Sequence, residues 1–122
     1  MPGAPKRILV IDDSELILEA TRLALVEAGF EVQATTEPAT PEGFAPDLIL
    51  LDVHMPQMFG DDVALFFREE RGIKAPIFLY STYPEPELAE RARDAGVAGY
   101  ISKGWGLERM VERVRAALGD ET

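Results

Sequence analysis

The chain has 122 residues, no cysteine, and 12 Lys and Arg against 22 Asp and Glu, which gives a net charge of −10. The length fits one domain of ordinary size, so we expect a single domain over residues 1–122. The negative charge argues against binding to nucleic acid or anionic lipid, and the lack of cysteine excludes disulfides and thiolate catalysis. No apolar run approaches the roughly 18 residues that insert into a membrane, and residues 1–7 lack an apolar signal core, which indicates a cytoplasmic protein.

Strand-like and helical patterns alternate along the chain. Short apolar or alternating runs predict strands at residues 7–11, 30–34, 48–51, 76–80 and 97–101. Helical spacing of apolar residues, with capping residues at the ends, predicts helices at residues 14–28, 61–71, 86–95 and 107–118. The second strand alternates in polarity, as a strand at a sheet edge does, whereas the first, third and fourth are apolar throughout and belong inside the sheet.

The connection between Thr36 and Pro46 is unusual because it contains Pro38, Pro41 and Gly43. Proline interrupts the hydrogen bonding of a helix interior, so we expect the second helix to be shortened or irregular. Repeated strand–helix units require right-handed crossovers and a mostly parallel sheet. The predicted fold class is therefore α/β, with a doubly wound, five-stranded, flavodoxin-like sheet of order 2-1-3-4-5.

Four of the predicted strands end in residues suited to phosphoryl chemistry. In chain order these residues are Asp12 with Asp13, then Asp52, Ser81 and Lys103. The carboxyl ends of parallel strands meet at one edge of the sheet, so we expect the five side chains to share a pocket. Three carboxylates repel one another unless a cation joins them, and Mg²⁺ prefers carboxylate, carbonyl and phosphate oxygens. Asp52 is the best placed nucleophile, because a carboxylate can form an aspartyl phosphate.

These residues lie in stretches that resemble a known family. Residues 8–14 (ILVIDDS), 46–58 (PDLILLDVHMPQM), 76–81 (PIFLYS) and 99–103 (GYISK) resemble the receiver domains of two-component response regulators, and in particular those of the stand-alone chemotaxis type. The resemblance implies that Asp52 takes a phosphoryl group from a histidine kinase or phosphotransfer protein. It implies a domain that assists only its own phosphorylation and dephosphorylation, and that then signals to a downstream target protein or forms a homodimer.

The resemblance also implies roles for single residues. Mg²⁺ would be held by Asp12, Asp13, Asp52 and the backbone carbonyl of His54. Ser81 and Lys103 would contact the phosphoryl group. Tyr100 would be an aromatic switch that turns inward when Ser81 moves toward that group, and so would change the surface formed by residues 86–95, 97–101 and the last helix.

Three residues depart from the family pattern, and one of them is Phe59, which stands where the family often has an aspartate. Gly104 follows Lys103 where the family usually has a proline, often after a cis bond, and we expect a trans bond here because a non-proline cis bond costs about 2.5–4 kcal/mol. Thr82 follows Ser81 where a small residue is usual, and it can crowd the phosphoryl group. Trp105 either anchors a partner or packs the last loop down.

Two alternative functions stay open at this stage. One is a pseudo-receiver that binds a partner and never takes phosphate. Gly104 and Thr82, which follow the functional residues Lys103 and Ser81, leave this alternative open. The other is a small phosphatase that works through an aspartyl phosphate. Such enzymes place a second aspartate two residues after the nucleophile, where this chain has His54.

Overall fold

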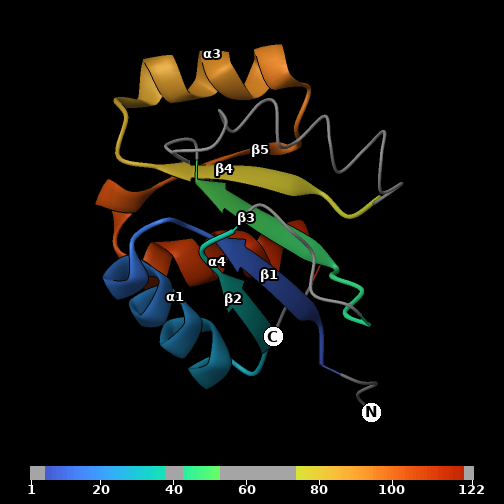
Figure 1. The fold of residues 1–122 in the computed structure, drawn as a ribbon. Coiled ribbons are helices and arrows are strands. Elements are labelled where there is room, and N and C mark those ends of the chain that lie inside the picture. Colours follow the sequence, from blue (N-terminus) through green and yellow to red (C-terminus); the bar gives the residue numbers. More distant parts are fainter. Residues whose placement is uncertain (1–4, 38–42, 53–73, 120–122) are drawn as a thin grey trace.

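The computed structural model describes residues 5–37, 43–52 and 74–119 (Figure 1). The described elements are, in chain order, β1 (Arg7–Ile11), α1 (Glu15–Glu27), β2 (Glu31–Thr35), β3 (Leu48–Asp52), β4 (Ile77–Ser81), α3 (Glu85–Ala95), β5 (Gly99–Ser102), the 3-10 turn η1 (Lys103–Trp105) and α4 (Leu107–Ala117). The helix expected at residues 61–71 lies outside the described residues. In the second crossover, residues 36–37 and 43–47 are not helical, and residues 38–42 lie outside the description.

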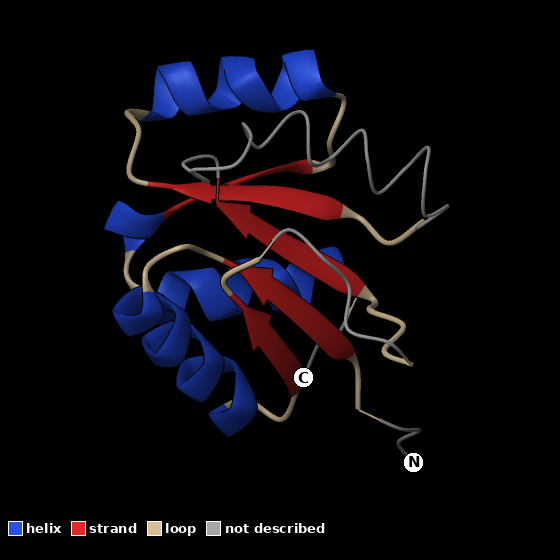
Figure 2. Cartoon of the chain, in the orientation of Figure 1, coloured by secondary structure: helices blue, strands red, loops and turns tan. Residues whose placement is uncertain are grey.

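The five strands form one parallel sheet of order β2-β1-β3-β4-β5, which confirms the predicted topology. Helix α3 covers one face of the sheet, and α1 and α4 cover the other (Figure 2). None of the described helices is both long enough and apolar enough to cross a membrane.

The core lies on both faces of the sheet, because successive strand residues point to opposite sides. On the face toward α3, the buried side chains are Leu9, Ile11, Ile49, Leu51, Ile77 and Leu79, with Leu88 and Ala92 from the helix. On the other face they include Ile8, Val10, Leu48, Leu50, Phe78, Tyr80 and Ile101, with Leu18 and Leu25 from α1 and Met110 and Val114 from α4. The central strands are apolar throughout because both of their faces are covered.

The fifth strand begins two residues later than predicted. Gly96 adopts a left-handed conformation with φ of 70° and ends α3. The backbone N–H of Val97 then donates to the carbonyl of Ala92 at 3.2 Å, so it closes the helix rather than joining the sheet. The prediction that the fifth strand starts at Val97 is therefore wrong, and the strand starts at Gly99.

The turn from β1 into α1 is fixed by short polar side chains. Ser14 is the predicted N-cap, and its Oγ accepts a hydrogen bond from the N–H of Ile17 at 3.4 Å. One residue pair earlier, Asp12 Oδ1 accepts from the N–H of Ser14 at 2.9 Å. The second of these bonds holds the Asp12 carboxylate at the carboxyl end of β1.

Candidate functional site

Three aspartates from two neighbouring strands form an acidic cluster. Asp12 and Asp13 follow β1, and Asp52 is the last residue of β3, which pairs with β1 in the sheet. One carboxylate oxygen from each of the three lies within 4.8 Å of the other two. Asp12 and Asp52 are buried, whereas Asp13 is exposed. The cluster therefore combines two buried charges with one that meets solvent.

Lys103 provides a positive charge within this cluster. It follows β5 directly and begins η1. Its Nζ lies 2.7 Å from Oδ2 of Asp12 and 3.6 Å from Oδ1 of Asp52. The lysine side chain is only 11% exposed, and those of the two aspartates are 1% and 2% exposed. Buried charges are stable when they are paired in this way, so one ammonium offsets part of the repulsion between the two carboxylates.

Ser81 ends β4, the strand next to β3, and is fully buried. Its Oγ accepts a hydrogen bond from the backbone N–H of Tyr83 at 3.0 Å. A serine hydroxyl can accept and donate at once, so its O–H is available to donate to an oxygen placed beyond the strand end. The structure thus brings Asp12, Asp13 and Asp52 close together, pairs Lys103 with Asp12 and Asp52, and places Ser81 at the same edge of the sheet.

The predicted switch residue Tyr100 lies outside the acidic cluster. It is half-buried on β5, and its hydroxyl donates to Oε1 of Glu85 at 3.4 Å. Trp105 donates from Nε1 to the other oxygen of the same carboxylate at 2.9 Å, and its ring lies 5.9 Å from that of Tyr100. Trp105 also packs against the core on the α1 side of the sheet, as expected if it packs the last loop down, and it is only partly buried. His54, the remaining predicted ligand, lies outside the described residues.

The loop after Lys103 has no cis peptide bond among the described residues, as predicted from Gly104. The N–H of Gly104 donates to Oγ of Ser102 at 3.1 Å. Proline has no N–H and cannot make this bond. The backbone N–H of Gly104 therefore contributes a contact that caps the start of the 3-10 turn carrying Lys103.

Tyr80 is a neighbour of the site that the sequence reasoning did not identify. Lys103 Nζ lies over its ring, 5.3 Å from the centroid, and its hydroxyl lies 3.4 Å from Oγ1 of Thr21 on α1. Burial raises the pKa of the Tyr80 phenol above its ordinary value of 10. The sequence signal for Tyr80 is that it is the one phenol in the apolar run IFLYS, since a buried tyrosine hydroxyl usually has a hydrogen-bond partner.

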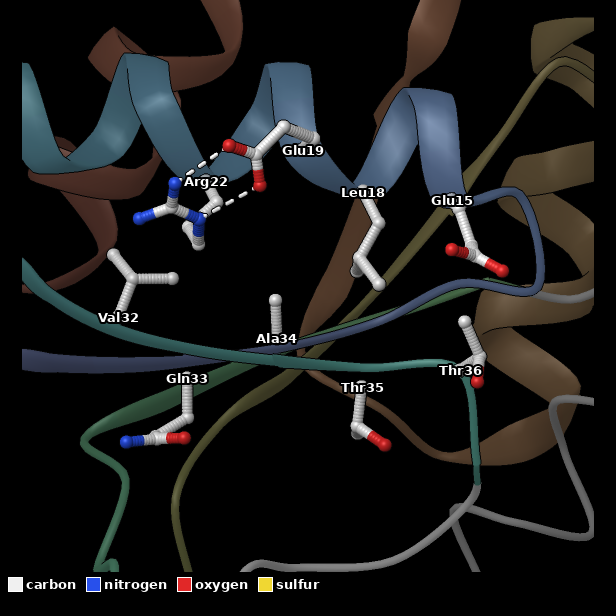
Figure 3. Close-up of a pocket in the computed structure, with 9 residues that line it drawn as sticks. All are labelled: Glu15, Leu18, Glu19, Arg22, Val32, Gln33, Ala34, Thr35 and Thr36. Carbon is white, nitrogen blue, oxygen red and sulfur yellow. Dashed lines mark hydrogen bonds and ion pairs between the residues drawn. The ribbon is translucent and has the colours of Figure 1, made fainter.

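An open groove of about 740 Å³ lies elsewhere, between α1 and the edge strand β2 (Figure 3). Its lining residues are Glu15, Leu18, Glu19, Arg22, Val32, Gln33, Ala34, Thr35 and Thr36. The charged pair Glu19 and Arg22 spans one turn of α1 at its rim and is exposed (Figure 3). None of the acidic-cluster residues lines this groove, so the strand-end pocket and the groove are separate features.

The response regulator receiver domain family has a model that matches residues 8–115. This chain belongs to that family. It is 32% identical over 123 residues to the transcriptional regulatory protein PdtaR of Mycobacterium tuberculosis, a match that covers 95% of this chain and 58% of PdtaR. It is 27% identical over 121 residues to the polar-differentiation response regulator DivK of Brucella anthropi, over 95% of this chain and 98% of DivK. The chain thus spans just over half the length of PdtaR.

Solved receiver structures have the same fold. The chemotaxis protein CheY4 of Vibrio cholerae is 27% identical, covers 94% of this chain and 100% of its own, and has a TM-score of 0.84. A CheY-like receiver domain from Methanospirillum hungatei is 26% identical, covers 95% of both chains, and has a TM-score of 0.82. Receiver domains are signalling domains rather than enzymes of the usual kind.

The donor set of this receiver domain fits the Mg²⁺ that receivers bind at an acidic pocket. The three carboxylates are hard oxygen ligands close enough to share one cation. Oδ2 of Asp12 is buried and accepts no hydrogen bond within the described part of the chain, so the Lys103 ammonium is the positive charge that faces it. Asp12, Asp13 and Asp52 would hold the ion.

Proposed function

We propose that this chain is a phosphoacceptor receiver domain, in which Asp52 takes a phosphoryl group from a histidine kinase or a phosphotransfer protein. The observation that carries the proposal is that the Lys103 ammonium faces the carboxylates of both Asp52 and Asp12. Lys103 lies 2.7 Å from Asp12 and 3.6 Å from Asp52. This places one cation within reach of any group that becomes attached to the end of β3.

Each residue has a distinct part in the proposed transfer. An oxygen of Asp52 attacks phosphorus, and the bond from phosphorus to the donor breaks as the new bond forms. The Lys103 ammonium moves from Asp12 toward a phosphoryl oxygen, and the Ser81 hydroxyl donates to another. When bound, Mg²⁺ supplies further positive charge next to the transferring oxygens, which is the main demand of phosphoryl transfer. Asp12, Asp13 and Asp52 would be its ligands together with the backbone carbonyl of His54.

The output of the proposed reaction is a change of surface. Tyr100, on β5, and Trp105, in η1, are tied to α3 through Glu85. Phosphorylation of Asp52 would shift Ser81 and Lys103 toward the phosphoryl group. Ser81 lies shortly before α3 in the chain, and Lys103 is the first residue of η1. We propose that the surface formed by α3, β5 and α4 is thereby altered, and that a downstream protein binds it differently in the two states.

Acetyl phosphate tests the proposal directly. With Mg²⁺, the intact mass of the wild type is expected to rise by one phosphoryl group, and Asp52→Asn is expected to show no rise. Asp94→Asn is the matched control, because Asp94 is an exposed aspartate on α3, away from the acidic cluster. The proposal is refuted if the wild type gains no phosphoryl group at any Mg²⁺ concentration and also fails to bind beryllium fluoride.

A further inference from the structure

The aromatic ring of Tyr80 forms part of the surroundings of the Lys103 ammonium. Tyr80 lies on β4 directly before Ser81, and it pairs in register with Asp52 on β3. Lys103 Nζ lies over the face of the ring at 5.3 Å from the centroid, within the roughly 6 Å over which a cation–π contact is significant. Both side chains are largely removed from water, since Tyr80 is 3% exposed and the lysine side chain 11%.

The ring is held in place from its far end. The Tyr80 hydroxyl lies 3.4 Å from Oγ1 of Thr21, which is fully buried on α1. Burial raises the pKa of the Tyr80 phenol, so the side chain is neutral at physiological pH and presents an aromatic face rather than a phenolate charge. The contact with Lys103 is therefore made by the ring itself and does not depend on ionisation of the hydroxyl.

We propose that Tyr80 is a positioning residue for Lys103, and that its ring keeps the ammonium within reach of Asp52 while the lysine changes partners. The inference rests on the proposed phosphoacceptor function. In the structure Lys103 Nζ lies closer to Asp12 than to Asp52, at 2.7 Å against 3.6 Å. To neutralise a phosphoryl group on Asp52, the ammonium has to leave the shorter of these two contacts.

A ring suits this task better than a third carboxylate or a hydroxyl. A hydrogen bond weakens steeply when its angle or distance changes, so a polar partner would favour a single position of the ammonium. A cation–π contact needs only that the cation lie over the ring face within about 6 Å of the centroid, so it tolerates more than one position of the cation. The ring of Tyr80 can therefore stay in contact with Nζ both when it pairs with Asp12 and when it pairs with a phosphoryl oxygen.

The competing explanation is that Tyr80 only fills the core. Phe78 offers a matched control, because it lies on the same strand and the same face, is also 3% exposed, and belongs to the same core cluster. Its ring is stacked by Arg113 at 4.8 Å instead of by Lys103. Phe78→Leu thus removes an aromatic ring from this core without removing the contact to Lys103, and Tyr80→Phe keeps the contact while removing the hydroxyl.

The test measures the rate of phosphorylation by acetyl phosphate at saturating Mg²⁺, together with thermal unfolding, for all of these variants. We expect Tyr80→Leu to lower the rate constant about tenfold, which is equivalent to about 1.4 kcal/mol, because an ammonium that leaves Asp12 then has no second contact to keep it within reach of the phosphoryl group. Tyr80→Phe should stay within about twofold of the wild type, because the aromatic face is retained. Phe78→Leu should lower the unfolding temperature, as Tyr80→Leu does, but leave the rate near that of the wild type.

Equal rates for folded Tyr80→Leu and the wild type would overturn the inference, and so would an equal loss of rate in Phe78→Leu. If Tyr80→Leu does not fold, the phosphorylation rate of Tyr80→Met is compared with that of the wild type instead. A wild type that takes no phosphoryl group would instead refute the proposed function, which distinguishes the two failures.

A second measurement needs no phosphoryl donor. In nuclear magnetic resonance spectra of the metal-free protein, the Lys103 side-chain methylene protons should be shifted by the Tyr80 ring current in the wild type and in Tyr80→Phe. They should return toward ordinary lysine positions in Tyr80→Leu. Ordinary Lys103 positions in the wild type would overturn the inference whatever the rates are.

Discussion

Replacing Lys103 with methionine is expected to destabilise the metal-free protein strongly. At an effective dielectric constant of about 20, the ammonium attracts the Asp12 carboxylate by about 6 kcal/mol across 2.7 Å and that of Asp52 by about 5 kcal/mol across 3.6 Å. The nearest oxygens of the two carboxylates are at most 4.8 Å apart, so they repel each other by at least about 3 kcal/mol. Much of the attraction is offset by the desolvation of the lysine.

The net cost comes from the charges left behind. Without Lys103, two buried carboxylates face each other with no ammonium between them. Breaking a buried ion pair from one side typically costs about 3–5 kcal/mol. We therefore expect Lys103→Met to lower the free energy of unfolding by about 3 kcal/mol in a chelator such as EDTA. Added Mg²⁺ should stabilise the variant more than the wild type, because the ion replaces a missing positive charge.

Urea unfolding at pH 7, with and without Mg²⁺, measures both effects. Lys74→Met is the matched control, because Lys74 is exposed, and it should change the free energy by no more than about 0.5 kcal/mol. If the free energy of unfolding of Lys103→Met in EDTA lies within about 1 kcal/mol of that of the wild type, the ion pairs of Lys103 contribute little to stability. A smaller Mg²⁺ effect in the variant would show that the carboxylates and Lys103 do not share one site.

Three further outcomes follow from the same contacts. Gly104→Pro should cost about 1 kcal/mol of unfolding free energy in a denaturant titration, because it deletes the N–H donated to Ser102, whereas Gly104→Ala keeps that bond and should cost less. The raised pKa of Tyr80 adds stability that is full below pH 10 and declines as pH rises toward the folded-state pKa, so the wild type should lose more stability than Tyr80→Phe over that range. Trp105 is the only tryptophan, so its fluorescence should change when beryllium fluoride and Mg²⁺ bind, and an unchanged spectrum would contradict a link from Lys103 to Trp105.

The fold was predictable wherever burial alone decides the pattern. β3 and β4 are covered on both faces, so their residues read as unbroken apolar runs, and the polar residue that ends each one marks the edge of the sheet. The start of β5 was not predictable in the same way. Val97 is apolar in either assignment, and only the geometry of the α3 terminus shows that its N–H closes the helix.

The acidic cluster followed from topology, because parallel strands bring their carboxyl ends to one edge. The partners of single side chains did not. Glu85 bonds Tyr100 and Trp105, which are 15 and 20 residues away along the chain, and no local pattern indicates such a contact. The ring of Tyr80 likewise contacts Lys103 only because β5 pairs with β4 and Lys103 directly follows β5.

The contacts around η1 also suggest how a charge at Asp52 is linked to the surface. Lys103 and Trp105 are the first and last residues of one 3-10 turn, and the hydrogen bond from the Gly104 N–H to Ser102 Oγ caps its start. A phosphoryl group on Asp52, as proposed, draws the Lys103 ammonium away from Asp12. Because the turn is only three residues long, we expect this displacement to move Trp105 as well, and the Trp105 indole is hydrogen-bonded to Glu85 at the start of α3. In the proposed mechanism Lys103 would therefore have two linked roles, because the residue that neutralises the phosphoryl group also begins the segment that reaches Glu85 on α3.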